Sequence, residues 1–321
     1  MSGAPNVSPA ARERVWAAVE RLGFEPNRLA RSLRSGSTMG IGIVVPDVAI
    51  GFFASALKGA QELLEASGYH ALVANTDRDA ARETEALRTL RAHQVDGLIL
   101  ATSGGYRDIG VPAVFFDDVP SAPAAGAVAL CNAEGVATLV EHLVNAHGLS
   151  RLAYVGPPAT PSRGVAPFTH RVGRERLDGF RAAVGRAGLA LPPECVRTSD
   201  PACTAEEAAA AARELLALPE RPQGIIAGAD TLAMGVLDAA RGMGLDVPGD
   251  VALVSFDEPA YAHLIDPPMT SLDRHDGQLG RRAAEMLLAA LADGGASLDE
   301  PEVERVPLEL RVRRSCGCTP S

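Results

Sequence analysis

The chain has 321 residues, of which 47% are hydrophobic and 22% charged, a composition typical of globular domains and not of disordered, collagen-like or membrane-spanning chains. At this length two or three compact units are expected. The formal charge of −10 argues by itself against nucleic acid, whose phosphates attract cations. That charge is unevenly distributed, because residues 1–39 hold six arginines against three glutamates. The N-terminal segment is therefore cationic and the remainder of the chain anionic.

Two short helices are predicted in this cationic segment. Ser8 is a good N-cap, Pro9 suits a first helical turn, and Gly23 ends the first helix. In residues 27–34 two leucines are spaced four apart among three arginines. Such a segment fits a surface helix packed on the core, or a short helix in a DNA minor groove whose apolar side chain opens a base step while arginines meet phosphates.

From residue 40 onward, short apolar runs alternate with longer segments of helical periodicity. This alternation predicts βαβ units with parallel sheets, here two α/β units of similar size. The predicted strands are Ile41–Val45, Ala71–Ala74, Gly97–Leu100, Ala113–Phe116, Ala127–Leu130, Leu152–Val155, Cys195–Arg197, Gly224–Ala227 and Val251–Phe256. The predicted helices are Phe52–Ala66, Ala80–His93, Glu134–Ala146, Gly173–Gly188, Ala205–Ala217, Thr231–Met243 and Asp276–Ala292, and Glu302–Arg313 is predicted as a strand pair. If these last two segments return to the two units, several crossovers join them, which suits hinged closure over a ligand at the strand ends.

Catalytic signatures are missing from the sequence. It contains no G-x-G-x-x-G after the first strand, no Walker A loop and no G-x-S-x-G elbow. Acidic pairs such as Asp117-Asp118 and Asp257-Glu258 could serve acid–base chemistry, but carboxylates after strand ends bind sugar hydroxyls as readily. We therefore expect a binding protein without a cofactor, and not an enzyme.

The five cysteines are an odd, scattered set, which favours free thiols over a disulfide framework. Cys316 and Cys318 form a close pair, but no other cysteine or histidine is near them in sequence. His142 and His147 lie five apart, which is not the spacing of four found on a zinc-binding helix. We therefore expect no metal, and solvated or capping histidines. The N-terminus lacks the regions of a secretory signal, so a cytoplasmic protein is expected.

Short motifs along the whole chain carry a resemblance to a known family. They are Asn6–Pro9, Arg12–Val15, Leu22–Gly36, Ile41–Asp47, Phe52–Ala54, Phe116–Asp118, Glu141–Leu143, Ala229–Gly235, Val254–Asp257 and Arg313–Gly317. In this order they resemble lactose-repressor/galactose-repressor (LacI/GalR) transcription regulators. The resemblance implies a cytoplasmic, homodimeric, ligand-responsive regulator, in most cases a repressor of carbohydrate genes. The alternative is a solute-binding protein of the same fold without DNA binding.

The implied fold class is α/β, with a two-lobed, periplasmic-binding-protein-like (type I) core of two parallel-sheet, Rossmann-like subdomains. A partial helical DNA-binding head and a hinge helix precede it in residues 1–38. The N-terminal effector-binding subdomain is expected in residues 39–148 plus 275–302, and the C-terminal one in 149–274 plus 303–321. In the family, the first two helices of the helix-turn-helix precede the position of Met1. Because the recognition helix makes most base contacts, we expect this polypeptide to bind double-stranded operator DNA weakly.

The resemblance also assigns roles to single residues. In the hinge, Leu33 matches the minor-groove leucine, and the expected DNA-contacting residues are Asn27, Arg28, Ala30, Arg31, Leu33 and Arg34. In the core, Arg176 matches the effector-clamping arginine and Asp257 the carboxylate that accepts from effector hydroxyls, although this pair could also be an ordinary interlobe salt bridge. The expected effector-binding residues are Phe53, Asn132, Arg176, Asp230, Asp257 and Arg274, with Phe53 either stacking on the ligand or packing in the core.

Some pocket positions depart from the family pattern. Cys131 and Ala229 stand where polar residues are common, and Arg274 replaces a common glutamine. Losing two polar partners and gaining a cation suggests an effector other than a plain neutral hexose, such as an acidic or phosphorylated sugar derivative.

Overall fold

The computed structural model describes residues 8, 10, 13–14, 17–18, 21, 37–101, 109–117, 119, 126–159, 169–198, 204–259, 261–294 and 302–319. The chain divides into two compact units, Met1–Met39 and Gly40–Ser321. In the first unit, the described residues at 10, 13–14, 17–18 and 21 are helical, where the sequence predicts the first helix. The expected DNA-contacting residues between Asn27 and Arg34 lie outside the described residues.

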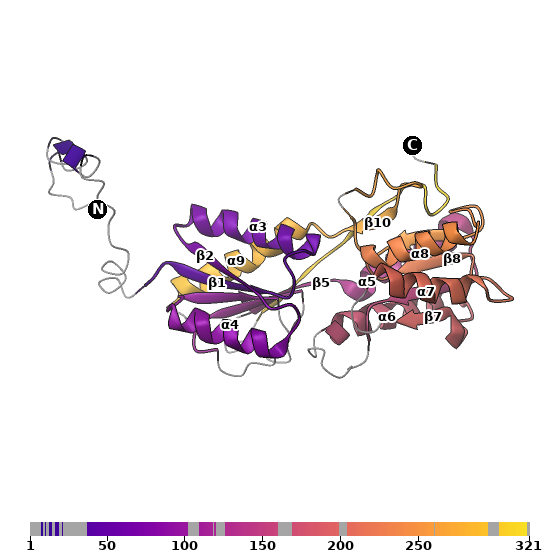
Figure 1. Ribbon diagram of the computed structural model, residues 1–321, viewed down its shortest axis with the longest axis horizontal. Coiled ribbons are helices and arrows are strands. Elements are labelled where there is room, and N and C mark those ends of the chain that lie inside the picture. Colours follow the sequence, from indigo (N-terminus) through magenta and orange to yellow (C-terminus); the bar gives the residue numbers. More distant parts are fainter. Residues whose placement is uncertain are drawn as a thin grey trace. The chain divides into compact units, whose positions relative to one another are not determined.

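The first sheet of the larger unit has six parallel strands in the order β11-β5-β4-β3-β1-β2. Their bounds are β1 Gly40–Val45, β2 His70–Asn75, β3 Gly97–Leu100, β4 Ala113–Phe116, β5 Gly126–Leu130 and β11 Val303–Val306. Helices α3 (Gly51–Ala66) and α9 (Asp276–Ala292) cover one face and α4 (Ala80–Ala92) covers the other (Figure 1). We call this sheet and its helices the first lobe.

The second sheet has the order β12-β10-β9-β8-β6-β7, and only the pair of β10 with β12 is antiparallel among its described pairs. Its strands are β6 Leu152–Gly156, β7 Val196–Thr198, β8 Gly224–Ala227, β9 Ala252–Ser255, β10 Thr270–Asp273 and β12 Glu309–Arg311. The helices of this second lobe are α5 Asn132–His147, α6 Thr169–Arg186, α7 Ala205–Leu216 and α8 Asp230–Gly242, and a 3₁₀ turn covers Pro193–Cys195. Both lobes thus have the α/β architecture expected from the sequence.

The lobe boundaries differ in two places from those predicted. Helix α5 packs on α6 and on strands of the second sheet, so the first crossover falls at residues 130–132 and not at 148. Strand β11 pairs with β5 in the first sheet, so the return to the second lobe comes after Val306 and not at residue 303. The predicted strand pair at 302–313 is therefore split between two sheets, because each strand completes an open sheet edge. Three crossovers, at residues 130–132, 273–276 and 306–309, connect the lobes.

Buried apolar strands and tight helix contacts hold the first lobe together. Every residue of β1, β3, β4 and β5 is buried, as expected for parallel strands covered by helices on both faces. Helices α3 and α9 approach closely at two glycines: a Cβ on Gly59 would lie 1.9 Å from the carbonyl oxygen of Gly277, and one on Gly280 would lie 1.8 Å from that of Ala56. Only glycine permits this contact, which fixes the start of α9 beside the second crossover.

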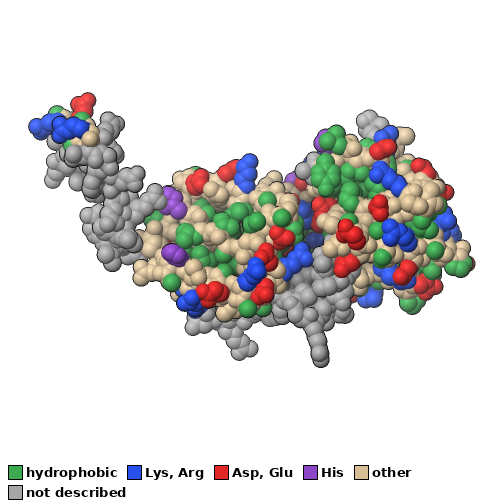
Figure 2. All heavy atoms as spheres, viewed as in Figure 1, with side chains coloured by type: hydrophobic (Ala, Val, Ile, Leu, Met, Phe, Trp, Pro, Cys, Tyr) green, Lys and Arg blue, Asp and Glu red, His purple; other side chains and the backbone are tan. Residues whose placement is uncertain are grey.

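The surface carries charges of both signs. Figure 2 shows acidic and basic side chains interspersed over the visible face of residues 40–321, with apolar side chains between them. Among the described residues, no helix is long and apolar enough to cross a bilayer.

Candidate functional site

Two arginines and an aspartate meet where strands of the second lobe end. Arg176 lies on α6, Asp257 follows β9, and Arg274 follows β10 at the second crossover. Nη1 of Arg274 is 2.7 Å from Oδ1 of Asp257, and Nη1 of Arg176 is 3.5 Å from the same oxygen. All three residues are less than 9% exposed. We call these three residues, together with Asp117, Asp230 and Asp276, the interlobe charge cluster.

Arg274 is held from several sides. Its Nη2 donates to Oδ2 of Asp276, at the start of α9, at 3.2 Å, and its Nε lies 3.0 Å from Oδ1 of the same carboxylate. Its guanidinium carbon lies 4.4 Å from the centre of the Phe52 ring, which places the cation on the aromatic face. The second crossover thus carries a cation that bridges a carboxylate of each lobe.

Arg176 is held in a comparable way. Its Nε donates to Oδ1 of Asn132 at 3.0 Å, and its Nη1 donates to the carbonyl of Gly228 at 2.7 Å. Its guanidinium lies 3.7 Å from the centre of the Phe256 ring. Asn132, the first residue of α5, also donates to Glu175 at 2.9 Å. Arg176 therefore has a fixed orientation.

Burial shifts the ionisation of the carboxylates around these arginines. It raises the pKa of Asp117 to about 6, although Arg176 and Arg274 oppose the shift. Oδ1 of Asp117 is buried and has no hydrogen-bond partner among the described residues, and φ of this residue is +69°. Burial, reinforced by Asp257, also raises the pKa of Asp230, and burial raises that of Asp276 against the effect of Arg274. A strained, incompletely partnered carboxyl at a strand end is typical of a ligand-binding position.

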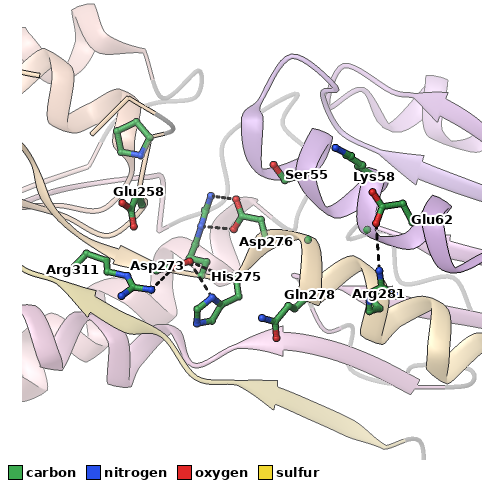
Figure 3. A pocket seen from close by; sticks show the side chains of 14 residues that line it. Ser55, Lys58, Glu62, Glu258, Asp273, His275, Asp276, Gln278, Arg281 and Arg311 are labelled. Carbon is green, nitrogen blue, oxygen red and sulfur yellow. Dashed lines mark hydrogen bonds and ion pairs between the residues drawn. The ribbon is translucent and has the colours of Figure 1, made fainter. Parts of the chain in front are cut away.

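A separate hollow of about 590 Å³ lies beside the second crossover (Figure 3). Its lining includes Ser55 and Lys58 of α3, and Glu62 points toward Arg281 of α9, at 3.4 Å. It shares only Arg274 and Asp276 with the interlobe charge cluster. We place the ligand site at the cluster and not at this hollow, because the cluster is where buried polar groups converge on the carboxyl ends of parallel strands.

Comparison with known proteins gives a consistent result. The periplasmic binding protein-like domain family matches residues 140–316, more than half of the chain. The ribose operon repressor of Escherichia coli (strain K12) is 29% identical over 310 residues, which cover 94% of this chain and 90% of the repressor. The chain belongs to the LacI/GalR family.

Solved structures of LacI/GalR proteins agree with this assignment. A structure described as a LacI-family transcriptional regulator from Sanguibacter keddieii DSM 10542 is 29% identical with a TM-score of 0.76, and the match covers 87% of this chain and 99% of that one. The complex of the transcriptional regulator CelR with cellobiose is 27% identical with a TM-score of 0.73, covering 98% of this chain and 93% of that one. The two-lobed core is thus the LacI/GalR effector-binding core.

Five of the six residues that the family resemblance assigned to the effector meet in or beside the cluster. Arg176, Asp257 and Arg274 form its centre, Asn132 orients Arg176, and Asp230 begins α8 within electrostatic range of Asp257 and Arg274. Phe53 lies apart from them: it is 8% exposed, and its ring packs 4.9 Å from Phe52 and 6.3 Å from Phe116.

The six effector residues expected from the sequence leave out four members of this cluster and its surroundings, although Asp117 was noted as part of an acidic pair after a strand. The aromatic rings that support the two guanidiniums belong to Phe52 and Phe256. The additional carboxylates are Asp117, after β4, and Asp276, at the start of α9. Asp117 and Phe256 directly follow strands and Asp276 lies at the second crossover, so position was an available signal for these three. Phe52 lies in the first turn of α3, away from any strand end, and had no such signal.

One further group of side chains could hold a metal. His142, His147, Cys316 and Cys318 lie together in the second lobe, with all ligand atoms within 4.8 Å of one another. The sequence analysis considered the cysteine pair and the histidine pair separately and expected no metal at either.

Proposed function

We propose that this LacI/GalR chain is an effector-responsive transcriptional repressor that binds a sugar between its lobes. The convergence of Arg176, Asp257 and Arg274 at strand ends beside the second crossover carries the proposal. Guanidinium N–H groups donate to sugar oxygens, and carboxylates accept from sugar O–H groups, so the cluster can grip a polyol on both sides. Because a regulator of chromosomal genes acts where the DNA is, we propose that this protein acts in the cytoplasm.

The charge balance of the cluster favours a neutral effector. Four carboxylates surround two guanidiniums, and Arg274 is already paired with Asp257 and Asp276. The cation that suggested an acidic or phosphorylated ligand in the sequence is therefore neutralised within the protein. The phosphate group of a phosphorylated ligand would lie among more carboxylates than unpaired guanidiniums. Electrostatic repulsion would therefore weaken its binding.

Regulation is proposed to act through lobe closure. Asp117 and Asp276 belong to the first lobe, whereas Asp230 and Asp257 belong to the second, so an effector bridging them stabilises one relative position of the lobes. Only a difference in effector affinity between two arrangements can shift their populations. In a homodimer, closure would change the spacing of the two hinge segments, including Leu33, and thereby the affinity for DNA.

Calorimetry with ribose, glucose, cellobiose, glucuronate and glucose 6-phosphate tests the effector site. We expect a neutral sugar to bind to the wild type and an Asp257→Asn variant to lose at least about tenfold in affinity, because one charge-assisted hydrogen bond is worth about 1.5–3 kcal/mol. Glu309→Gln, on exposed β12, is the matched control and should bind normally. Binding of glucose 6-phosphate alone would contradict the neutral-effector proposal, and conversion of any sugar would indicate an enzyme.

Fluorescence anisotropy with DNA enriched from a random duplex library tests the regulatory role. Binding is expected to weaken steeply with salt, because cationic side chains displace counterions from the phosphates. A Leu33→Ala variant should have a lower affinity for the enriched DNA, with the same dependence of affinity on salt, because leucine contacts bases and arginines contact phosphates. Absence of salt-dependent DNA binding would favour the solute-binding alternative.

A further inference from the structure

Two histidines and two cysteines meet at the C-terminal end of α5. His142 and His147 lie on that helix, and Cys316 and Cys318 lie in the segment after β12. Nε2 of His142 is 3.3 Å from Sγ of Cys316 and 3.7 Å from Sγ of Cys318, and Nε2 of His147 is 3.3 Å from Sγ of Cys318. Cys316 is buried and the other three are half-buried. The four ligating atoms therefore face one small volume that is largely shielded from solvent.

These separations match a tetrahedral metal centre. Zinc bonds of about 2.3 Å to sulfur and about 2.0–2.1 Å to nitrogen, at tetrahedral angles, place sulfur and nitrogen about 3.5–3.6 Å apart. The three nitrogen–sulfur distances lie on either side of that value. A single hydrogen bond would bring together one pair of atoms, whereas here His142 Nε2 faces both sulfurs.

The backbone between the two cysteines is shaped for this convergence. Gly317 has φ of +105°, which favours glycine, and a Cβ added to it would lie 3.3 Å from the His147 ring. The segment before it is fastened to the second sheet, since the Ser315 hydroxyl donates to Leu253 at 2.6 Å and accepts from the Thr270 amide at 2.8 Å. Both cysteines are thus held at fixed positions relative to the sheet.

Hydrogen bonds to the sulfur also fit a metal ligand. The Thr270 hydroxyl lies 3.2 Å from Sγ of Cys316 and can donate to it. Hydroxyl or amide donors to a ligating sulfur are common around metal-bound thiolates, which they orient and stabilise. On the helix side, the two imidazole rings stand edge to face, with centroids 5.2 Å apart.

We propose that His142, His147, Cys316 and Cys318 bind one zinc ion in a four-coordinate structural site that fastens the C-terminal segment to α5. Two imidazole nitrogens and two thiolates form a donor set that zinc prefers, and four protein ligands fill its tetrahedral coordination. The thiols lose their protons on binding. The site is independent of the proposed effector site, since none of its ligands belongs to the interlobe charge cluster.

Metal analysis and cobalt spectroscopy of the full chain under reducing conditions test this site. We expect about one zinc per chain after purification without added metal or chelator. Co²⁺ should replace it and give the intense visible d–d absorption of a tetrahedral thiolate complex. Cys318→Ser and His147→Ala should each weaken Co²⁺ binding more than about 100-fold, because even an outer hydrogen-bond partner contributes 10–100-fold.

Matched controls are Cys131→Ser, a half-buried thiol, and His263→Ala, an exposed histidine, both outside the four-residue group. They should keep the zinc content and the cobalt spectrum of the wild type. Circular dichroism confirms that each variant is folded, and Cys318→Ser keeps nearly the same side-chain size. The proposal is overturned if Co²⁺ gives no tetrahedral spectrum, if both ligand variants retain wild-type affinity, or if the reduced chain holds no zinc and binds none when it is added.

Discussion

The two ends of α5 carry polar clusters of opposite character. At its first residue, Asn132 orients Arg176 in a crowded group of carboxylates and guanidiniums. Toward its other end, about 15 and 22 Å away along the helix axis, His142 and His147 face two thiols. The first cluster consists of buried ionisable groups in which four carboxyl groups surround two guanidiniums. The second consists of two imidazoles and two thiols, of which the thiols become charged thiolates when a metal displaces their protons.

The difference shows how each cluster depends on its surroundings. Buried charges are stable only while each keeps its counter-charge, so loss of one partner strongly destabilises the interlobe charge cluster. Neutral thiols and imidazoles need no counter-charge, so loss of one member of the histidine–cysteine group leaves no buried charge unpaired. One end of the helix is therefore sensitive to charge and pH, and the other to metal.

Removal of Arg274 should have the largest effect. Arg274→Ala removes the cation beside Asp276 and leaves Asp257 with the more distant Arg176, and breaking a buried ion pair costs about 3–5 kcal/mol of unfolding free energy. Urea denaturation at pH 7 measures the loss. Arg88→Ala, which removes an exposed pair with Glu85, should leave stability unchanged. Equal free energies of unfolding for the two variants would show that the buried ion pairs of Arg274 contribute no more to stability than the exposed pair of Arg88.

Asp117 should give a pH-dependent effect of intermediate size. Because its pKa rises from 3.8 to about 6 on folding, the folded state binds more protons between these values, and its stability falls as pH rises through them. The cost above pH 6 is at most about 3 kcal/mol and vanishes below about pH 4. Asp117→Asn, which tolerates the positive φ, should therefore stabilise the protein at pH 7.5 and not at pH 4.

Denaturation curves across this pH range give the free energy of unfolding of the wild type and of Asp117→Asn. The difference between the two free energies isolates the contribution of Asp117. A difference that stays constant with pH would contradict the raised pKa. Comparison of the effector affinity at pH 5 and pH 7.5 then shows whether the sugar binds more tightly when Asp117 is protonated or when it is ionised.

Substitution of Gly317 should have a smaller effect, and it distinguishes a loss of metal affinity from a loss of stability. Gly317→Ala adds strain at a positive φ, about 1–3 kcal/mol, and a contact with the His147 ring. Gly188→Ala adds similar strain at φ of +68° after α6, with nothing within 4 Å of its new Cβ. Both should lower thermal stability, but only the first should weaken Co²⁺ binding. Equal cobalt affinities would show that Gly317 does not shape the metal site.

The two phenylalanines should give the smallest difference. Phe52 supports Arg274 through a cation–π contact worth about 0.5–2 kcal/mol, whereas Phe53 packs against Phe116. Phe52→Leu should therefore lower the affinity for the best-binding sugar more than Phe53→Leu. The opposite order, measured by calorimetry, would favour direct stacking of Phe53 on the ligand.

The sequence by itself predicted most elements of the fold and named three residues, Arg176, Asp257 and Arg274, that the structure brings together. Strand–helix alternation is local, because burial of one face of a helix and both faces of a parallel strand imposes distinct periodicities. Strand ends in such sheets lie at one edge, so Asp257 could be placed there, and the family motifs identified Arg176. β10 was missed because Thr270-Ser271-Leu272-Asp273 has little apolar character, although Thr270 and Ser271 are fully buried.

Only the tertiary structure decided which distant segments meet. β11 and β12 are separated by two residues yet join different sheets, because pairing depends on which sheet edges are open. His142 and Cys316 lie 174 positions apart, so neither the spacing of the histidines nor that of the cysteines could indicate the other pair. Periodicity reports how a segment is buried, whereas the partner of a segment is set by the path of the whole chain.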